Sequence, residues 1–322
     1  MVVNPHPENW HEDYFATKSG EGVRFGIALP DNSPPKAVVT LLHGRGESME
    51  KYFETMRDLN AAGYACATLD WPGQGLSGRG LPDEPQKHHN TSYDDLLSAL
   101  LKFKKDVIPS HIQNSGDIPQ LLMGHSMGGH LGLRYLAEHE GDYQAAVFSA
   151  PLIRYHIIPP VKYNGKVVSA PAFLDKILFK IIKRADNDYI PFGGKWTEEK
   201  QLHQMDRLTS DARRHSYLRQ AFLENPKLQV GSWSAITAKE AFRSCQKLKS
   251  ETVETPTLIF MAENEMVVDN HAIKEFAQKQ PNMEVRTLED ALHEIPVERD
   301  EIRNKFMSGM TDFFDHHALK MK

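Results

Sequence analysis

The sequence predicts an α/β protein: a mostly parallel sheet with helices on both faces and an inserted helical cap. Short apolar runs rich in β-branched residues alternate with helical patterns, as expected for strands joined by crossover helices. This alternation stops between residues 151 and 250. The chain has 322 residues, of which 40% are apolar and 25% charged, so it can fill the core of one large globular domain with an insertion.

The first two expected strands, residues 13–17 and 23–29, flank a glycine-containing turn and predict an antiparallel hairpin at the sheet edge. Six short, nearly continuous apolar runs predict strands that are covered on both faces. They are residues 37–42, 64–69, 120–123, 145–148, 257–261 and 284–288. Helical patterns between and after them cover residues 52–62, 93–107, 127–138, 270–278 and 301–316.

Residues 151–250 carry helical stretches and loop signals but no series of strand patterns, and we interpret them as an inserted cap. Residues 1–150 and 251–322 then form the core. The insertion holds 18 Lys and Arg against 9 Asp and Glu, although the whole chain has a net charge of −5. This asymmetry predicts an anionic surface or ligand near the insertion.

One stretch of the cap, residues 171–184, places bulky apolar side chains on one helical face and Lys and Arg on the other. Two interpretations stay open. The helix either packs on a core, as most such helices do, or touches an anionic lipid surface and lines an acyl entrance.

Composition excludes several classes of protein. A net charge of −5 argues against nucleic-acid binding. Cys66 and Cys245 are too few for a disulfide framework, and the chain shows neither a signal-peptide pattern nor an apolar run long enough to span a membrane. We therefore expect a cytoplasmic protein, with peripheral contact to the inner face of the membrane through the basic cap. The sequence does not predict the oligomeric state.

The strongest chemical signal is the sequence Gly-His-Ser-Met-Gly at residues 124–128. An apolar run precedes it and a helical pattern follows, which is the strand–turn–helix setting of a nucleophile elbow with Ser126 at the turn. The alternative is a glycine-rich turn of a nucleotide-binding unit, but no matching glycine-rich or Walker pattern accompanies it.

A serine hydroxyl needs a neighbouring base and a group that orients this base. His293 follows the last expected strand, on a loop at the carboxyl edge of the sheet. Glu265 follows the preceding strand and stands before an apolar stretch that would bury it, whereas Asp269 fits better as the cap of the next helix. The order Ser126, Glu265, His293 is that of the nucleophile, acid and base of the α/β-hydrolase fold.

The oxyanion of an acyl-transfer reaction must meet hydrogen-bond donors that are already in place. We expect these to be the backbone N–H groups of Met127, which follows the nucleophile, and of Arg45, in the loop after the strand at 37–42. No metal or organic cofactor is implied. The pairs His88-His89 and His316-His317 lack the spacing of a zinc site, and we interpret them as polar surface residues.

Five motifs together resemble the monoacylglycerol lipase and bacterial lysophospholipase group of serine α/β-hydrolases, over about residues 10–318. They are His-Gly-Arg-Gly-Glu-Ser at 43–48, Asp-Trp-Pro-Gly-Gln-Gly-Leu-Ser at 70–77, Gly-His-Ser-Met-Gly-Gly at 124–129, Glu-Met-Val-Val-Asp-Asn at 265–270 and Leu-His-Glu at 292–294. The lysophospholipase branch is the most similar, although the acid is Glu265 where monoacylglycerol lipases carry Asp.

This resemblance implies hydrolysis of the carboxyl ester of a single-chain lipid, with lysophospholipid and monoacylglycerol both open as substrates. Two alternatives remain at this point. The same three residues would serve a general carboxylesterase or an acyltransferase. A non-enzymatic binding protein on a hydrolase scaffold is the other.

Overall fold

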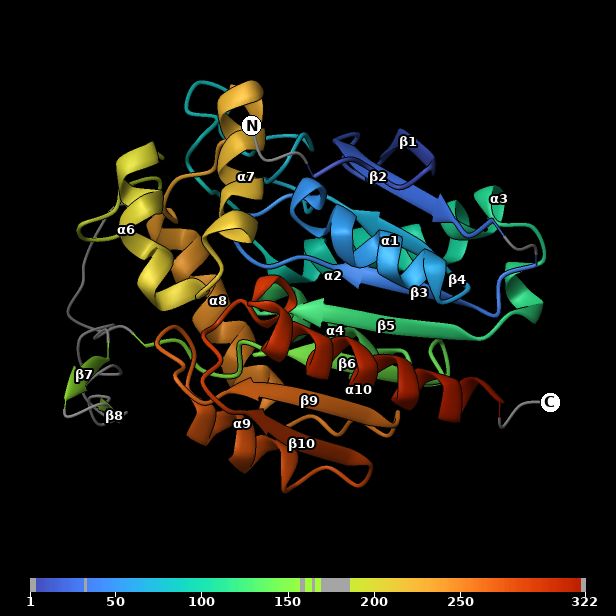
Figure 1. Cartoon of the computed structure of the whole chain (residues 1–322). Helices are drawn as coiled ribbons and strands as arrows, with labels where there is room; N and C mark the ends of the chain where they lie inside the picture. The colour runs from blue at the N-terminus through green and yellow to red at the C-terminus, as the bar shows by residue number, and fades with distance from the viewer. Residues whose placement is uncertain (1–3, 32–33, 157–159, 164–165, 169–185, 320–322) are drawn as a thin grey trace.

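The computed structural model describes residues 4–31, 34–156, 160–163, 166–168 and 186–319. Its centre is an eight-stranded sheet with the order β1-β2-β4-β3-β5-β6-β9-β10 (Figure 1). The strands are β1 (Asn9–Ala16), β2 (Gly22–Leu29), β3 (Ala37–Leu42), β4 (Tyr64–Leu69), β5 (Gln120–His125), β6 (Ala145–Ser149), β9 (Thr257–Ala262) and β10 (Met283–Leu288).

Strand directions confirm the predicted fold class. The pairs β1–β2 and β2–β4 are antiparallel, and the pairs from β4 to β10 are parallel. Every predicted strand is present, and β3 and β4 have the predicted bounds. These two strands and β5, β6 and β9 are buried along their whole length, which explains their continuous apolar runs.

Helices cover the sheet on both faces (Figure 1). On one face, α1 (Phe53–Ala61) and α10 (Asp300–Leu319) pack Met56 and Phe306 against alternate strand residues such as Val39 and Met123. The opposite face packs residues such as Leu100 and Leu131 against Val38 and Leu122. The helices of this second face are α2 (Tyr93–Lys102), α4 (Met127–Glu138), α8 (Ala235–Leu248) and α9 (Asn270–Ala277).

Helix ends differ modestly from the prediction. The helix expected over 52–62 is preceded by a 3₁₀ turn, Met49–Tyr52. The helix expected over 93–107 continues from α2 through a π-helical turn, Phe103–Val107, into the short α3 (Ile108–His111). The helix α4 has the predicted bounds.

Between β6 and β9 the chain forms α6 (Glu198–Leu208), α7 (Ala212–Glu224) and α8, together with a short hairpin of β7 (Val161–Tyr163) and β8 (Lys166–Val168). This hairpin was not predicted. Although α8 falls within the expected cap, it contacts α2 and α4 beside the sheet. The boundary between core and cap stays a prediction, and the expected helix over 171–184 lies outside the described residues.

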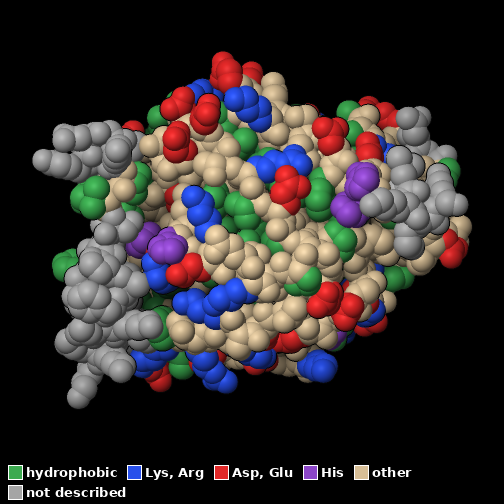
Figure 2. All heavy atoms as spheres, turned by 90° about the horizontal axis from the view of Figure 1, so that it is seen from below, with side chains coloured by type: hydrophobic (Ala, Val, Ile, Leu, Met, Phe, Trp, Pro, Cys, Tyr) green, Lys and Arg blue, Asp and Glu red, His purple; other side chains and the backbone are tan. Residues whose placement is uncertain are grey.

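The surface carries both signs of charge. On the face seen from below, acidic and basic side chains lie interspersed, with apolar side chains in smaller groups (Figure 2). Within the described residues, no helix has both the length and the apolar character needed to cross a bilayer.

Candidate active site

Ser126 lies at the sharp turn between β5 and α4. Its φ of 51° is in a region that non-glycine residues rarely occupy, so the turn holds this residue under strain. The helix packs so closely on β3 that a Cβ atom on Gly128 would fall 2.2 Å from the Leu42 carbonyl oxygen. Glycine at position 128 therefore permits the close approach that aims Ser126 out of the carboxyl edge of the sheet.

His293 joins Ser126 to a buried carboxylate. Its Nε2 lies 3.1 Å from Ser126 Oγ, and its Nδ1 lies 2.8 Å from Glu265 Oε2. All three side chains are buried. The structure thus brings together three residues that are up to 167 positions apart in the sequence, at distances suitable for proton transfer.

Local hydrogen bonds hold Glu265 in place. Its other oxygen, Oε1, accepts from the amides of Val267 and Val268, at 2.7 and 3.1 Å. Asp269 instead caps α9 by accepting from the amides of His271 and Ala272. The structure therefore brings Glu265, and not Asp269, to His293.

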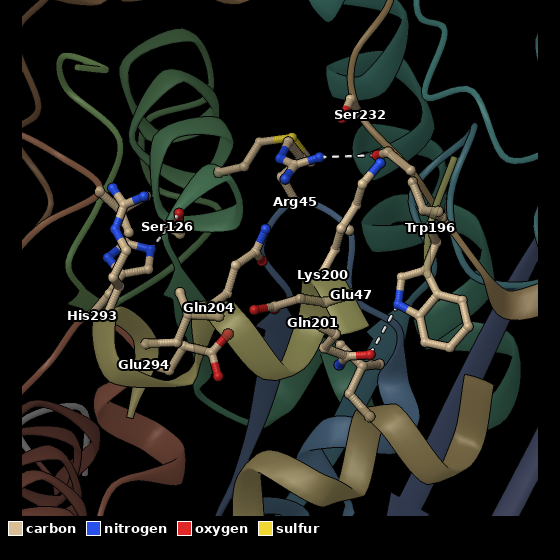
Figure 3. Close-up of a pocket in the computed structure, with 18 of the residues that line it drawn as sticks. Arg45, Glu47, Ser126, Trp196, Lys200, Gln201, Gln204, Ser232, His293 and Glu294 are labelled. Atoms are coloured by element: carbon tan, nitrogen blue, oxygen red, sulfur yellow. Dashed lines mark hydrogen bonds between the residues drawn. The ribbon is translucent and has the colours of Figure 1, made fainter. Parts of the chain in front are cut away.

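A pocket of about 260 Å³ opens onto Ser126 and His293 (Figure 3). Arg45 and Met127, whose amides are expected to meet the oxyanion, both line it. The Arg45 side chain reaches away from its loop to the segment before α8, where Nη1 donates to the Gly231 carbonyl at 3.2 Å and the guanidinium lies 5.6 Å from the Trp233 ring. This loop is therefore tied to the opposite wall of the pocket.

That opposite wall comes from the chain between β6 and β9. Lys200, Gln201, Gln204 and Arg207 project into the pocket from α6 at helical spacing (Figure 3 labels the first three). Trp196 and Phe222 add apolar surface beside them. Lining by both apolar and polar side chains suits a ligand with an acyl chain and a polar head.

A buried ionic group that was not predicted lines one part of the pocket. Lys51 Nζ is 2.6 Å from Glu47 Oε1 and 2.7 Å from Glu294 Oε1, and Tyr52 donates to Glu47 at 2.8 Å. Burial disfavours the charged form of Glu47, but the Lys51 ammonium outweighs it and holds the pKa of Glu47 below its ordinary value. Burial likewise disfavours the charged form of Lys51, and the two carboxylates nevertheless raise its pKa. In the sequence, only the four-residue spacing of Glu47 and Lys51, which suits an ion pair, pointed to this group.

Three other histidines have a pKa below the ordinary value of the imidazole. His125 lies beside His293, with 4.8 Å between the centroids of the two tilted rings, and burial lowers its pKa well below the ordinary value. His88 and His89 were predicted to be polar surface residues, and this was wrong. Both are buried, and burial lowers the pKa of each.

No group of three or more His, Cys, Asp or Glu side chains suitable for a metal ion occurs in the described part of the chain.

Chains that place a serine at this turn, with an acid and a histidine following after later strands, are serine hydrolases of the α/β-hydrolase fold, and the geometry assigns this chain to that class. The model of the hydrolase family described as serine aminopeptidase, S33, matches residues 33–300, and the chain belongs to this family.

Named relatives are similar to this chain over most of its length. Lysophospholipase L2 of Escherichia coli (strain K12) is 27% identical over 299 residues, which cover 87% of this chain and 81% of the relative. The monoglyceride lipase of Saccharomyces cerevisiae is 24% identical and covers 97% of this chain and 94% of its own. The crystal structure of a soluble variant of that lipase has a TM-score of 0.70 at 21% identity, over 98% of this chain and 97% of the lipase chain, and this likeness confirms the fold.

Proposed function

We propose that this chain hydrolyses the carboxyl ester of single-chain lipids, either lysophospholipid or monoacylglycerol, through an acyl-enzyme on Ser126. The observation that carries the proposal is the hydrogen-bonded series from Glu265 through His293 to Ser126 at the base of an open pocket. The names of the relatives, lysophospholipase and monoglyceride lipase, support the substrate class.

In the proposed mechanism, His293 Nε2 removes the proton of Ser126 Oγ as this oxygen attacks the ester carbonyl. Glu265 orients the imidazole and stabilises its charged form. The amides of Arg45 and Met127 donate to the oxyanion of the tetrahedral intermediate. His293 then gives its proton to the leaving alcohol, and in the second half it activates the water that releases the fatty acid.

The pocket charge argues against a peptide substrate that presents a free amino terminus. Five Lys and Arg side chains line the pocket against two Glu. Both carboxylates are already paired with Lys51. The cations of the lining outnumber its carboxylates, so a protonated amine would enter a pocket of net positive charge, and an ester with a neutral or anionic alcohol fits better.

Replacement of Ser126 tests the proposal. We expect Ser126→Ala to lower ester hydrolysis by at least about 10³-fold, because the nucleophile is lost while the fold is kept. Fatty acid release from lysophosphatidylcholine, lysophosphatidylethanolamine and monoacylglycerol measures it, with the unfolding midpoint as the control for folding. Turnover near that of the wild type would refute the assignment. Hydrolysis of short acyl esters alone would favour a general carboxylesterase.

We further propose that the protein works in the cytoplasm, in peripheral contact with an anionic membrane surface. The excess of basic residues over 151–250 supports this contact, and the two free, buried cysteines suit a reducing compartment. Co-sedimentation with vesicles of increasing anionic lipid content tests the contact. Binding that is indifferent to anionic lipid would contradict it.

A further inference from the structure

Of the basic side chains that line the pocket, only one is paired with carboxylates in the described residues. Its basic lining residues are Arg45, Lys51, Lys195, Lys200 and Arg207. Lys51 lies between the two lining carboxylates, and its one positive charge offsets only one of their two negative charges. Even with the second carboxylate counted, the basic residues of the lining outnumber the acidic ones. Within the part of the chain that the structure describes, the other four form no ion pair with a carboxylate. The pocket therefore holds a surplus of cations that the protein itself does not neutralise.

Two of these cations converge at one end of the pocket. Arg45 Nη1 donates to the Gly231 carbonyl at 3.2 Å, and Lys200 Nζ donates to the Lys195 carbonyl at 3.3 Å. The two acceptor segments touch, since a Cβ atom on Gly231 would lie 2.5 Å from the Gly194 oxygen. Figure 3 shows the Lys200 side chain extending from α6 toward the Arg45 guanidinium. We call Arg45 and Lys200 the basic end of the pocket.

Like charges that lie together without an acidic partner repel one another, and a bound anion removes this cost. Carbonyl groups satisfy single donors of Arg45 and Lys200, which leaves their other N–H groups free for a ligand. Arg45 also carries the backbone amide expected at the oxyanion. An anion held by its side chain would therefore lie in the same pocket as the reacting ester.

We propose that the basic end binds the phosphate of the substrate's alcohol, so that the enzyme prefers a lysophospholipid to a neutral monoacylglycerol. This inference rests on the proposed function and chooses between its two substrates. Charged hydrogen bonds from guanidinium and ammonium groups to phosphate oxygens are strong and would be absent with glycerol alone. Gln204, one turn from Lys200 on α6, lines the same pocket and has an amide that can donate to the same group.

The test compares lysophosphatidylglycerol and monoacylglycerol with the same short acyl chain, both kept below their micelle concentrations. The phosphate group then distinguishes the two head groups, and surface binding does not contribute. For Lys200→Met we expect kcat/KM to fall about tenfold on lysophosphatidylglycerol and to stay within about twofold on monoacylglycerol. Lys227→Met, which removes an exposed lysine outside the pocket, should change neither value.

A second readout uses a competing ligand instead of the lipid. Glycerol 3-phosphate should inhibit hydrolysis of a neutral short-chain ester by the wild type, and this inhibition should weaken about tenfold in Lys200→Met. Glycerol at the same concentration should not inhibit. If Lys200→Met lowers both hydrolysis rates equally, or leaves both rates and the inhibition unchanged, the phosphate site is wrong while the proposed function stands. A wild type that cleaves no ester contradicts the proposed function, and the inference falls with it.

Discussion

Glu265 and Asp269 lie four residues apart in one loop, yet their carboxylates have different partners. Glu265 leaves the end of β9 and accepts two amides of its own loop through one oxygen, which leaves the other oxygen for His293. Asp269 begins α9 and directs its carboxylate back to the first free amides of that helix. A carboxylate thus contacts the imidazole of His293 at one position and caps a helix at the other.

This separation makes a matched pair of variants. Glu265→Gln should lower kcat by about 10³- to 10⁴-fold with little change in KM, because the imidazole loses the charge that orients and stabilises it. Asp269→Ala should cost about 1–3 kcal/mol of folding free energy, because it removes both the helix cap and the ion pair with Arg154, and kcat should stay within about threefold. Steady-state kinetics and urea unfolding measure both. Equal loss of kcat in the two variants would contradict the assignment of the acid.

The sequence was informative for residues whose roles follow from position along the chain. Ser126, Glu265 and His293 each follow a predicted strand, and parallel strands bring their carboxyl ends to one edge. Lys51 and Lys200 were not identified, because their roles depend on which charges meet in three dimensions. Helical spacing alone does not distinguish Lys51, buried between two glutamates, from a solvated lysine.

At the scale of elements, the buried strands β3 and β4 were predicted more closely than the edge strand β1, which begins four residues before its expected start. Buried strands such as β3 and β4 must be apolar on both faces, so their bounds follow from composition. A helix end depends on capping and on local turns, and the continuation of α2 into a π-helical turn had no distinct sequence pattern. The β7–β8 hairpin was missed because each strand has only three residues, too short for a periodic pattern.

One ionic contact anchors α7 to the helix that follows β3. Arg214 binds both carboxylate oxygens of Glu54 in α1, at 2.8 and 2.9 Å, and also reaches Asp211 and Asp300. Burial raises the pKa of Glu54, but hydrogen bonding to Arg214 and the nearby arginine charges outweigh burial and lower it to about 2. In the folded protein, Glu54 therefore stays charged at pH values well below its ordinary pKa of 4.5.

This shift predicts a dependence of stability on pH. A carboxyl group whose pKa is lowered by folding stabilises the protein above its unfolded pKa, and this stabilisation is lost as the pH falls from about 4.5 toward 2. Arg214→Met should lower the free energy of unfolding by about 2–3 kcal/mol at pH 7, and the difference from the wild type should shrink over that acid range.

Urea unfolding at several pH values measures this difference. Arg243→Met is the control, because this arginine is 75% exposed and pairs with Glu240 at 3.4 Å within one helix. It should cost less than about 0.5 kcal/mol at any of these pH values. A difference for Arg214→Met that stays constant down to pH 2 would show that the pair with Glu54 is not its source.

In the whole molecule, the loops at the sheet edge and the chain between β6 and β9 contribute different walls of the pocket. Loops at the carboxyl edge of the sheet supply Ser126, His293 and the Arg45 loop, to which the proposed mechanism assigns the reaction chemistry. The chain between β6 and β9 supplies the facing wall with Lys200 and Trp196. The fold and the reacting residues could therefore be predicted from general rules, whereas the substrate-facing wall has no such rule and required coordinates.

The central claim is that three distant side chains make the Ser126 hydroxyl reactive. Labelling with a fluorophosphonate probe tests it most directly, because the probe reacts covalently with an activated serine. Intact-protein and peptide mass spectrometry should find one adduct per chain on Ser126, with labelling lost in Ser126→Ala and strongly slowed in His293→Ala. Labelling of another residue, or of Ser126 at an unchanged rate without His293, would contradict the account.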